Sequence, residues 1–348
     1  MQYHTENGGV FMKRQYVVFE EKNKPVLKCA EMREIADDEV LIELDYSVIS
    51  AGTERAMLTG MPNVTGKFPR IPGYSGCGHV IKVGKSVTDV KPGDKVLCDH
   101  LGHTSLAAAR RSTGSGKGYI KIPDDTDMLE ACFVVIGSMG LQGLRKTKPQ
   151  LGETIMITGL GILGMFALQG AVLCGGAPVI AVDFDKKRLE TALEYGADYA
   201  FSPQEPDFAE KVKAVTDGRM INCNIEVTGS AKALEQALHL AAPMGRIALT
   251  GCTRISDVNI DYYSLVHRPG IQLIGAHNFV RPAADSYEGY WTRHDDYSTI
   301  LRFMKRGKMS AKPIISEIIG LSDIERVYMR LVENPNAPLG IVIDWHKK

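Results

Sequence analysis

A glycine-rich turn between two apolar runs is the stretch of this chain whose spacing most directly predicts chemistry. The run 153–158 has strand character, and the run 165–171 has helical character. Between them stand Gly159, Leu160, Gly161, Ile162, Leu163 and Gly164. In this order the first glycine permits a tight turn, the second lets the backbone approach a pyrophosphate, and the third lets helix and strand pack closely. The free N–H groups at the positive end of the helix then favour the phosphates.

An acidic residue completes the same pattern one strand later. The apolar run 178–182 ends at Asp183, about 20 residues beyond the glycines. A carboxylate at this place accepts hydrogen bonds from the ribose hydroxyls of adenosine and repels a 2′-phosphate. The pattern therefore predicts a site for NAD(H), the alternative being a glycine-rich turn in an unrelated α/β unit. Lys187 either flanks the adenosine or is a solvated lysine on a helix face.

Composition narrows the class of protein. The chain has 348 residues, and its 41 basic and 41 acidic residues leave no formal net charge. Without a basic surplus we expect a small-molecule substrate and neither a nucleic-acid nor a membrane partner. The N-terminal segment lacks a signal-peptide pattern and the apolar runs are strand-length, so we expect a cytoplasmic protein. Seven cysteines without a CxxC pair predict neither a disulfide framework nor a four-cysteine zinc site.

The periodicity of the apolar residues changes along the chain. Residues 1–150 carry strand patterns such as 40–49, separated by turn signals such as Pro92-Gly93. From residue 151 strand and helix patterns alternate, which is typical of a doubly wound parallel sheet. The last part, 281–348, begins with an irregular, aromatic-rich segment. We therefore predict an α/β protein with a mostly β domain over 1–150, a Rossmann domain over 151–280 and a distinct segment over 281–348.

Motifs spread along the chain resemble those of the medium-chain dehydrogenase/reductase family, the relatives of zinc alcohol dehydrogenases. They include Pro72-Gly73, the stretch 90–96, the glycine turn and Gly251. The resemblance implies a GroES-like catalytic domain, an inserted Rossmann domain, and a return of 281–348 to the catalytic domain. It also implies hydride transfer with a nicotinamide in the cleft between the domains, and a homo-oligomer, either a dimer or a tetramer. Strand-end residues that line the cofactor in the family match Thr228, Gly251, Cys252 and His277.

The family's zinc ligands are replaced in this chain. The usual Cys-Gly-Thr-Asp stands as Ala51-Gly52-Thr53-Glu54, and the usual Gly-His-Glu stands as Gly73-Tyr74-Ser75. Zinc needs three or four ligands and alanine offers none, so we do not expect a zinc enzyme. The stretch 48–54 also looks like that of a zinc-lacking branch of the family. That branch includes oxidoreductases of sugar and polysaccharide metabolism. The resemblance therefore suggests a secondary alcohol in a sugar, cyclitol or other cyclic polyol as the substrate.

Without zinc, another group must hold and deprotonate the substrate hydroxyl. Thr53 matches the family's hydroxyl relay, and Tyr74 stands where a zinc ligand is expected. We predict that Tyr74 and Thr53 are the catalytic pair, the alternative being that Tyr74 only fills the space of the missing histidine. Two other functions stay open. One is a zinc-free quinone or enoyl reductase, and the other is a non-catalytic NAD-binding protein.

The remaining candidates for the substrate pocket are Glu54, His100, His277 and Trp291. Glu54 either binds a sugar hydroxyl or is a solvated acid at a helix N-terminus. His100 lines the pocket or, with Cys98 and His103, belongs to a metal site. His277 touches cofactor and substrate or is a satisfied histidine at a domain junction. Trp291 walls the pocket or belongs to a dimer contact.

Overall fold

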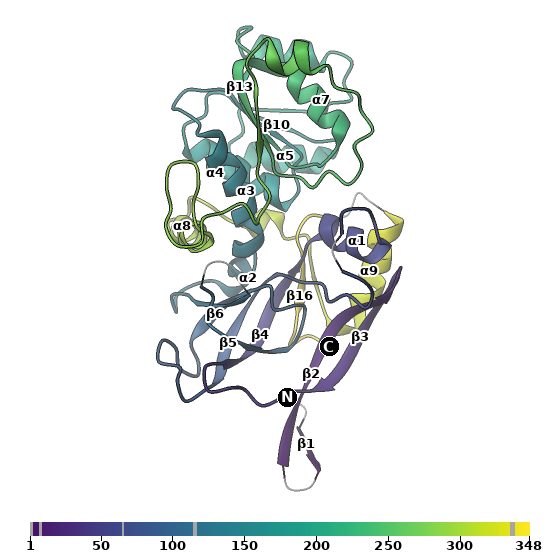
Figure 1. The fold of residues 1–348 in the computed structure, drawn as a ribbon, viewed down its shortest axis with the longest axis vertical. Helices are drawn as coiled ribbons and strands as arrows, with labels where there is room; N and C mark the ends of the chain where they lie inside the picture. The colour runs from purple at the N-terminus through teal and green to yellow at the C-terminus, as the bar shows by residue number, and fades with distance from the viewer. Residues whose placement is uncertain (1–2, 7–8, 65, 114–116, 335–337) are drawn as a thin grey trace. The chain divides into compact units, whose positions relative to one another are not determined.

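The computed structural model describes residues 3–6, 9–64, 66–113, 117–334 and 338–348. Its chain divides into two compact units (Figure 1). Unit 1 comprises residues 1–136 and 310–348, and unit 2 comprises residues 137–309. These units change at residues 136/137 and 309/310, whereas the domain boundaries predicted from the sequence are 150 and 280.

Unit 1 is built mainly of β-strands. One sheet has three strands in the order β1-β2-β3, and a second has seven strands in the order β15-β16-β4-β5-β6-β8, with β7 paired to β4. The strands are β1 (Tyr3–Glu6), β2 (Gly9–Glu21), β3 (Lys24–Glu31), β4 (Val40–Ile49), β5 (Ser75–Val83), β6 (Lys95–Asp99), β7 (Leu106–Ala109), β8 (Gly118–Lys121), β15 (Glu317–Ile319) and β16 (Ile341–Asp344). The helices are α1 (Ala51–Thr59), α2 (Met128–Ala131) and α9 (Ile324–Glu333), with 3-10 turns η2 (Lys312–Ile314) and η3 (Leu321–Asp323).

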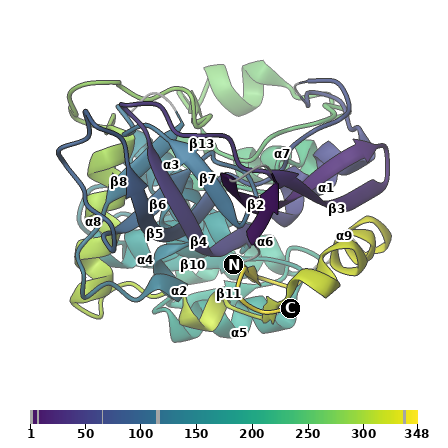
Figure 2. The same ribbon diagram turned by 90° about the horizontal axis from the view of Figure 1, so that it is seen from below.

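Helix α9 closes one side of the core of unit 1. Its buried residues Ile324, Val327, Tyr328 and Leu331 recur at the three- and four-residue spacing of an amphipathic helix. The helix lies beside β3 (Figures 1 and 2). The ring of Tyr328 meets that of Phe19 edge-on, with the centroids 5.0 Å apart. The apolar face of a C-terminal helix thus completes a core begun by the N-terminal strands.

A charged contact fixes the entry to β4. The guanidinium of Arg33 donates to both carboxylate oxygens of Glu39 at 2.7 and 2.8 Å, and the Ala36 N–H adds a bond of 3.0 Å. These donors, Arg33 first, lower the pKa of the buried Glu39 carboxyl from 4.5 to about 2. Because the pKa is depressed in the folded state, the stabilisation is complete above pH 4.5 and is lost as the pH falls from 4.5 toward about 2.

The Glu39→Gln variant should therefore be less stable than the parent protein at neutral pH, with a difference that shrinks on acidification. The amide keeps the shape of the side chain but removes the charge that Arg33 and the Ala36 N–H stabilise. Urea unfolding at a series of pH values from about 6 to about 3 measures this difference. Parallel curves for parent and variant over the whole series would contradict the assignment.

Unit 2 contains a single parallel sheet with helices along it. Its strand order is β11-β10-β9-β12-β13-β14, and every neighbouring pair is parallel. The strands are β9 (Ile155–Thr158), β10 (Val179–Val182), β11 (Tyr199–Phe201), β12 (Ile221–Glu226), β13 (Ala241–Leu249) and β14 (Gln272–Gly275). The helices are α3 (Val134–Thr147), α4 (Ile162–Leu173), α5 (Lys186–Glu194), α6 (Phe208–Val215), α7 (Ala231–Leu240) and α8 (Arg293–Lys305), with a π-helical turn η1 (Tyr263–His267). Counted along the chain this is the 3-2-1-4-5-6 order of a Rossmann fold, as predicted.

Two helices outside the predicted Rossmann boundaries belong to this unit for physical reasons. In α3, a Cβ added to Gly140 would lie 2.1 Å from the carbonyl oxygen of Leu163, so the helix packs directly on α4. The guanidinium of Arg145 in α3 donates to Asp296 of α8 at 2.6 Å. The periodic pattern of each helix was visible in the sequence, but these contacts between distant residues decide which core it joins.

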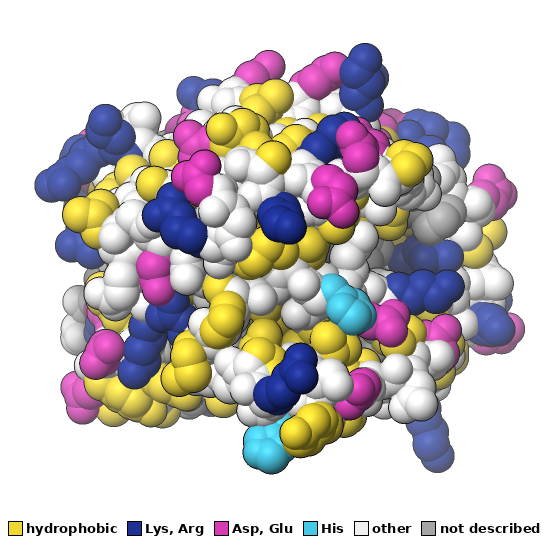
Figure 3. Space-filling model, turned by 90° about the horizontal axis from the view of Figure 1, so that it is seen from above, with side chains coloured by type: hydrophobic (Ala, Val, Ile, Leu, Met, Phe, Trp, Pro, Cys, Tyr) yellow, Lys and Arg dark blue, Asp and Glu magenta, His cyan; other side chains and the backbone are white. Residues whose placement is uncertain are grey.

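The charges are mixed on the surface. Figure 3 shows basic and acidic side chains interspersed over the face that it views, in keeping with the equal totals of 41 each. Among the residues that the structure describes, no helix combines the length and the apolar character that crossing a membrane requires.

Candidate functional site

The glycine turn and other predicted cofactor residues gather at one edge of the parallel sheet of unit 2. Thr158 pairs with Val182 and with Glu226, and the same register continues to the ends of β13 and β14. Five strands therefore end level with one another. The predicted residues that follow these strand ends are Gly159, Asp183, Thr228, Gly251, Cys252 and His277. Open α/β sheets bind ligands at this carboxyl edge, where the strand order reverses between β9 and β12.

Gly159 and Gly164 have the conformations that the spacing predicts, and Gly161 is surrounded by open space. Gly159 has φ +96°, which only glycine adopts readily. A Cβ added to Gly164 would lie 1.9 Å from the carbonyl oxygen of Gly159, so the helix needs glycine to pack there. Around Gly161 no described atom lies within 4 Å of such a Cβ, and no described side chain caps the start of α4. The turn thus leaves open space and free N–H groups, which suit a pyrophosphate.

Asp183 joins the glycine turn to the end of β10. Its Oδ2 accepts the Leu160 N–H at 2.7 Å, and its Oδ1 accepts the Asp185 N–H at 2.9 Å. The guanidinium of Arg188, in the first turn of α5, lies 3.7 Å from Oδ2. Carboxylate oxygens accept more than one bond each, so ribose hydroxyls remain suitable partners. Lys187 is exposed on α5. The next residue, Arg188, is a second cation at this place, which the sequence analysis did not identify.

A buried acid shapes the opposite wall of the turn and was also missed. Glu226 accepts the Thr228 hydroxyl and the N–H groups of Thr228 and Gly229, the latter two at 2.7 and 3.2 Å. Burial raises the pKa of the Glu226 carboxyl above its usual value. A Cβ on Gly159 would lie 2.7 Å from the Thr228 methyl, so Glu226 fixes the wall against which the turn packs. Cys252 and His277 are exposed at the same edge.

In unit 1 a second constellation lies where three adjacent strands end. Ser50 follows β4, Tyr74 precedes β5 and His100 follows β6, and the pairs Ser47–Gly76 and Ser75–Asp99 set the register. The phenol of Tyr74 donates to the Ser50 hydroxyl at 2.8 Å. The backbone N–H of His100 donates to the Tyr74 carbonyl at 3.0 Å, and the two rings stack with centroids 5.4 Å apart. Antiparallel pairing therefore brings two candidate residues together, with Ser50 as a partner that the sequence did not reveal.

The histidine of this constellation is held in a strained backbone. His100 has φ +58°, an uncommon value for a residue other than glycine and one that is concentrated at functional sites. Its Nδ1 is bonded to the carboxylate of Asp99, which is fully buried, whereas 26% of the His100 side chain is exposed. A carboxylate on Nδ1 orients the ring and leaves Nε2 for proton exchange. Asp99 is a further residue that sequence reasoning missed.

Thr53 and Glu54, adjacent in α1, have different environments. Thr53 lies in the first turn and is half-buried. Glu54 has no exposed surface and accepts bonds from the Ser50 N–H at 3.0 Å and the Tyr328 hydroxyl at 2.5 Å. The expectations that Glu54 contacts substrate or is a solvated acid therefore do not hold. Through the Ser50 N–H, its carboxylate holds the residue whose hydroxyl accepts the Tyr74 phenol.

His103 belongs to the same buried network. Its Nε2 lies 3.1 Å from a Glu54 oxygen, and its Nδ1 lies 2.8 Å from the Ser47 hydroxyl, which also accepts the Trp345 indole N–H at 3.0 Å. Burial and the charge of Glu54 raise the pKa of Tyr328 well above its usual value. Among the described residues, no group of three or more His, Cys, Asp or Glu side chains is arranged to hold a metal ion.

Trp291 does not lie at the cofactor edge. It lines a cavity together with Leu173 and Cys174 at the far end of α4, and with residues that lead into β9. The glycine turn lies at the other end of the same helix, which has 12 residues and is therefore about 18 Å long. The expectation that Trp291 walls the substrate pocket is therefore wrong. In a parallel sheet, the two ends of α4 lie at opposite edges, and Trp291 lies at the edge away from the glycine turn.

Comparison with known proteins agrees with both units. Residues 36–129 match the alcohol dehydrogenase GroES-like domain, and residues 163–298 match the zinc-binding dehydrogenase family. The chain is 26% identical to an uncharacterised zinc-type alcohol dehydrogenase-like protein of Haemophilus influenzae, over 93% of this chain and 97% of that protein. It is 25% identical to the sorbitol dehydrogenase of Bacillus subtilis, over 89% of this chain and 91% of that enzyme.

A solved structure shares the fold. The galactitol-1-phosphate dehydrogenase of Escherichia coli superposes with a TM-score of 0.80 at 20% identity, over 95% of this chain and 100% of that chain. Both units thus have counterparts along nearly the full length of a single known chain.

Proposed function

The chain belongs to the medium-chain dehydrogenase/reductase family, and we propose that it interconverts a secondary alcohol and a ketone with NAD(H) and without zinc. The observation that carries the proposal is the replacement of two motif positions for zinc by Ala51 and Tyr74, together with the bonded arrangement around Tyr74. Unit 2 offers the cradle for the dinucleotide, and unit 1 offers groups that handle a proton.

The carboxyl edge of unit 2 supports the cofactor assignment. The open space at Gly161 and the uncapped start of α4 suit the pyrophosphate, and Asp183 suits a ribose diol. A bound nicotinamide supplies the hydride acceptor or donor. The backbone at Thr228, Gly251 and Cys252 forms the rest of the carboxyl edge of the sheet. The exposed His277 offers a polar side chain at the same edge.

The Tyr74 constellation supports the proton-handling part of the proposal. The phenol and the Ser50 hydroxyl form a hydrogen-bonded pair that can hold a substrate oxygen and exchange its proton, while Thr53 supplies another hydroxyl one turn away. His100, stacked on the phenol and partly exposed, can pass the proton to solvent, and a positive charge on its ring would stabilise a phenolate. Buried Asp99 orients His100 for this step.

The residues of this chain do not fit a catalytic zinc ion. Alanine at position 51 offers no ligand, and Tyr74 is engaged with Ser50. The described residues hold no cluster with three ligand side chains, whereas zinc needs three protein ligands and an open position for catalysis. We therefore assign the role of the metal to hydrogen-bond donors and to proton exchange at Tyr74.

We propose a cyclic or linear polyol, including sugars and cyclitols, as the substrate class. The sorbitol and galactitol-1-phosphate dehydrogenases described above are named for polyol substrates. A screen of such alcohols and ketones with NAD(H) tests the proposal, with quinones and enones in a parallel arm. Turnover confined to the second arm would favour a double-bond reductase, and NADH binding without turnover in either arm would favour a non-catalytic protein.

Replacing Asp183 tests the preference for NAD(H). The parent protein should bind NADH at least about tenfold more tightly than NADPH, because the carboxylate repels a 2′-phosphate. Asp183→Ser removes the charge that repels the 2′-phosphate, so the variant should bind NADPH more tightly than the parent does. Fluorescence titration measures both cofactors, with Asp285→Ser, at an exposed position of the same unit, as a control. Tighter NADPH binding by the parent protein would contradict the assignment.

A further inference from the structure

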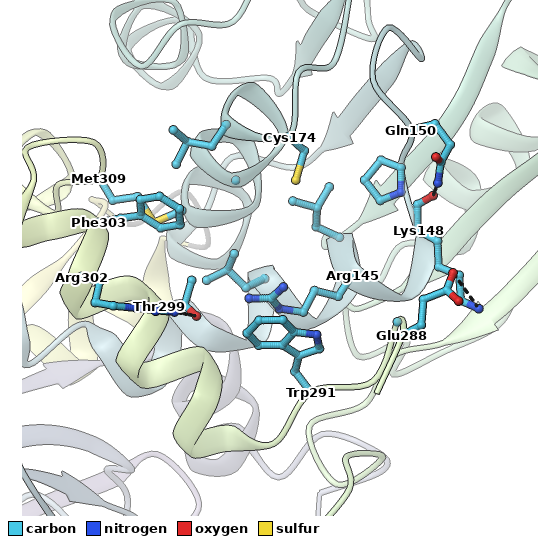
Figure 4. Close-up of a pocket in the computed structure, with 16 residues that line it drawn as sticks. Arg145, Lys148, Gln150, Cys174, Glu288, Trp291, Thr299, Arg302, Phe303 and Met309 are labelled. Atoms are coloured by element: carbon cyan, nitrogen blue, oxygen red, sulfur yellow. Dashed lines mark hydrogen bonds and ion pairs between the residues drawn. The ribbon is translucent and has the colours of Figure 1, made fainter. Parts of the chain in front are cut away.

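A cavity of about 440 Å³ in unit 2 lies away from the carboxyl edge of the sheet (Figure 4). Its walls come from the end of α3 and the loop that follows, from the last turn of α4, and from α8 with the segment 288–291. The volume falls within the range of about 300–1,000 Å³ in which proteins bind small organic molecules. Because all of its walls belong to one compact unit, the cavity is a property of that unit alone.

Apolar side chains form most of the cavity wall. Leucines 141 and 144 of α3 are buried, Leu173 closes the α4 side, and Phe303 and Met309 come from α8 and the loop after it. In Figure 4 the Phe303 ring and the Met309 side chain lie together on one side of the cavity, opposite Lys148 and Gln150. Such a wall favours the apolar body of a ligand.

Cations outnumber anions around this apolar wall. Arg145 lies over the Trp291 ring, 3.5 Å from its centroid, and shares the carboxylate of Asp296 with the nearly buried Arg281. One acid thus serves two guanidinium groups. Lys148 is 3.6 Å from the carboxylate of Glu288. The charges of Lys148 and Glu288 therefore balance each other.

Arg302 is the cation without an acidic partner at the cavity. Its side chain is exposed on α8, and its guanidinium donates to the Thr299 hydroxyl at 3.3 Å. Among the described residues, this bond to Thr299 is the interaction that the structure gives the Arg302 guanidinium, and no ion pair with Asp or Glu accompanies it. Thr299 itself lines the cavity, so the guanidinium is anchored at the rim by a neutral group. The rim therefore presents an uncompensated positive charge beside an apolar interior.

We propose that this cavity is a second ligand site, which binds a small amphipathic carboxylate. The apolar chain or ring of the acid would lie against the leucines and Phe303, and its carboxylate would accept hydrogen bonds from Arg302, with the stacked Arg145 as a second donor. A neutral ligand would leave the positive charge of Arg302 without a negative partner. A highly polar anion would leave the apolar side chains of the wall exposed to water. The combination selects an acid with an apolar body.

The site is separate from the dinucleotide cradle. Helix α4 joins the two, with Gly161 at its start and Leu173 at its end, about 18 Å apart for 12 residues. Carboxylate binding should therefore persist in the presence of saturating NADH. Competition between the two ligands would place the carboxylate at the cofactor edge and would overturn the proposal.

The test is a titration of the full-length protein with octanoate, and with octanamide as its neutral counterpart. The chain has two tryptophans, and Trp345 is almost fully buried in unit 1, so Trp291 fluorescence reports on the cavity in a Trp345→Phe background. Calorimetry on the unsubstituted protein provides an independent readout. We expect octanoate to bind more tightly than octanamide and to change the Trp291 emission.

Arg302→Gln is the diagnostic variant, and Arg306→Gln, at the C-cap of the same helix, is its matched control. Losing one charged hydrogen bond should weaken octanoate binding about tenfold and leave octanamide unchanged, whereas Arg306, which does not line the cavity, should have no effect. Equal loss in both variants would mean a nonspecific charge effect and would overturn the proposal. The proposal would also fail if the Trp291 emission changed with protein concentration and did not change on adding octanoate. A second copy of the chain would then cover the cavity.

Discussion

Tyr74→Phe should lower the turnover of the preferred alcohol about a hundredfold or more, because a positioned acid–base side chain typically contributes about 10²–10⁴ in rate. The substitution removes only the phenol oxygen. It keeps the ring that stacks on His100, so packing at the strand ends should be preserved. Steady-state kinetics with NAD and NADH titration measure turnover and cofactor affinity separately.

The affinity for NADH should not change in Tyr74→Phe, because the dinucleotide cradle belongs to unit 2 and the tyrosine to unit 1. Tyr262→Phe, at an exposed position of unit 2, is a matched control for loss of a phenol oxygen. Ser50→Ala should show a smaller loss of turnover, because it removes the partner of the phenol and leaves the phenol in place. Unchanged turnover in Tyr74→Phe would mean that this ring only fills the space of a missing zinc ligand.

Glu54→Ala should cost about 3–5 kcal/mol in the stability of unit 1, because it removes the acceptor of several buried hydrogen bonds and each buried donor left unsatisfied costs about 1–3 kcal/mol. The carboxylate accepts bonds from the Ser50 N–H, the Tyr328 hydroxyl and the His103 ring, and none of these donors reaches water. Without Glu54 they lose a shared acceptor inside a closed core. Glu54→Gln keeps one acceptor oxygen and should cost less.

Trp345 is a local reporter for this transition, because its indole N–H bonds to Ser47 at the end of the same network. Urea unfolding of Trp345 fluorescence in a Trp291→Phe background therefore isolates unit 1 from unit 2. Glu34→Ala, at an exposed position, should stay within about 0.5 kcal/mol of the parent. If Glu54→Ala matched Glu34→Ala, the buried network would have no role in holding unit 1 together.

The glycine turn could be predicted because it depends on backbone positions that are close in sequence. Gly159, Gly161 and Gly164 differ in what surrounds them, yet their spacing within one strand–turn–helix segment is enough to assign their roles. The strand ends at Thr228 and Gly251 could be predicted for a similar reason. In a parallel sheet, each strand delivers its last residues to the same edge.

Long-range contacts explain the residues that the sequence did not identify correctly. Glu54 is buried by Tyr328, which lies 274 positions away, and Trp345 reaches Ser47 across 298 positions. Ser50 became recognisable only when antiparallel pairing placed it beside Tyr74. Asp99 is the neighbour of His100 in the sequence, but its burial and its bond to the His100 ring are visible only in the folded chain. Trp291 follows an irregular segment without periodicity, so its sequence context did not show that it lies at the far end of α4.

Activity of the metal-depleted protein is the most direct test of the proposed zinc-independent chemistry. The protein should be treated with a strong chelator, checked by elemental analysis, and assayed for polyol-dependent reduction of NAD beside an untreated sample. We predict the same turnover in both samples, because Tyr74, Ser50 and His100 act without a metal. Loss of activity on depletion, with recovery on adding one equivalent of zinc, would contradict the proposal.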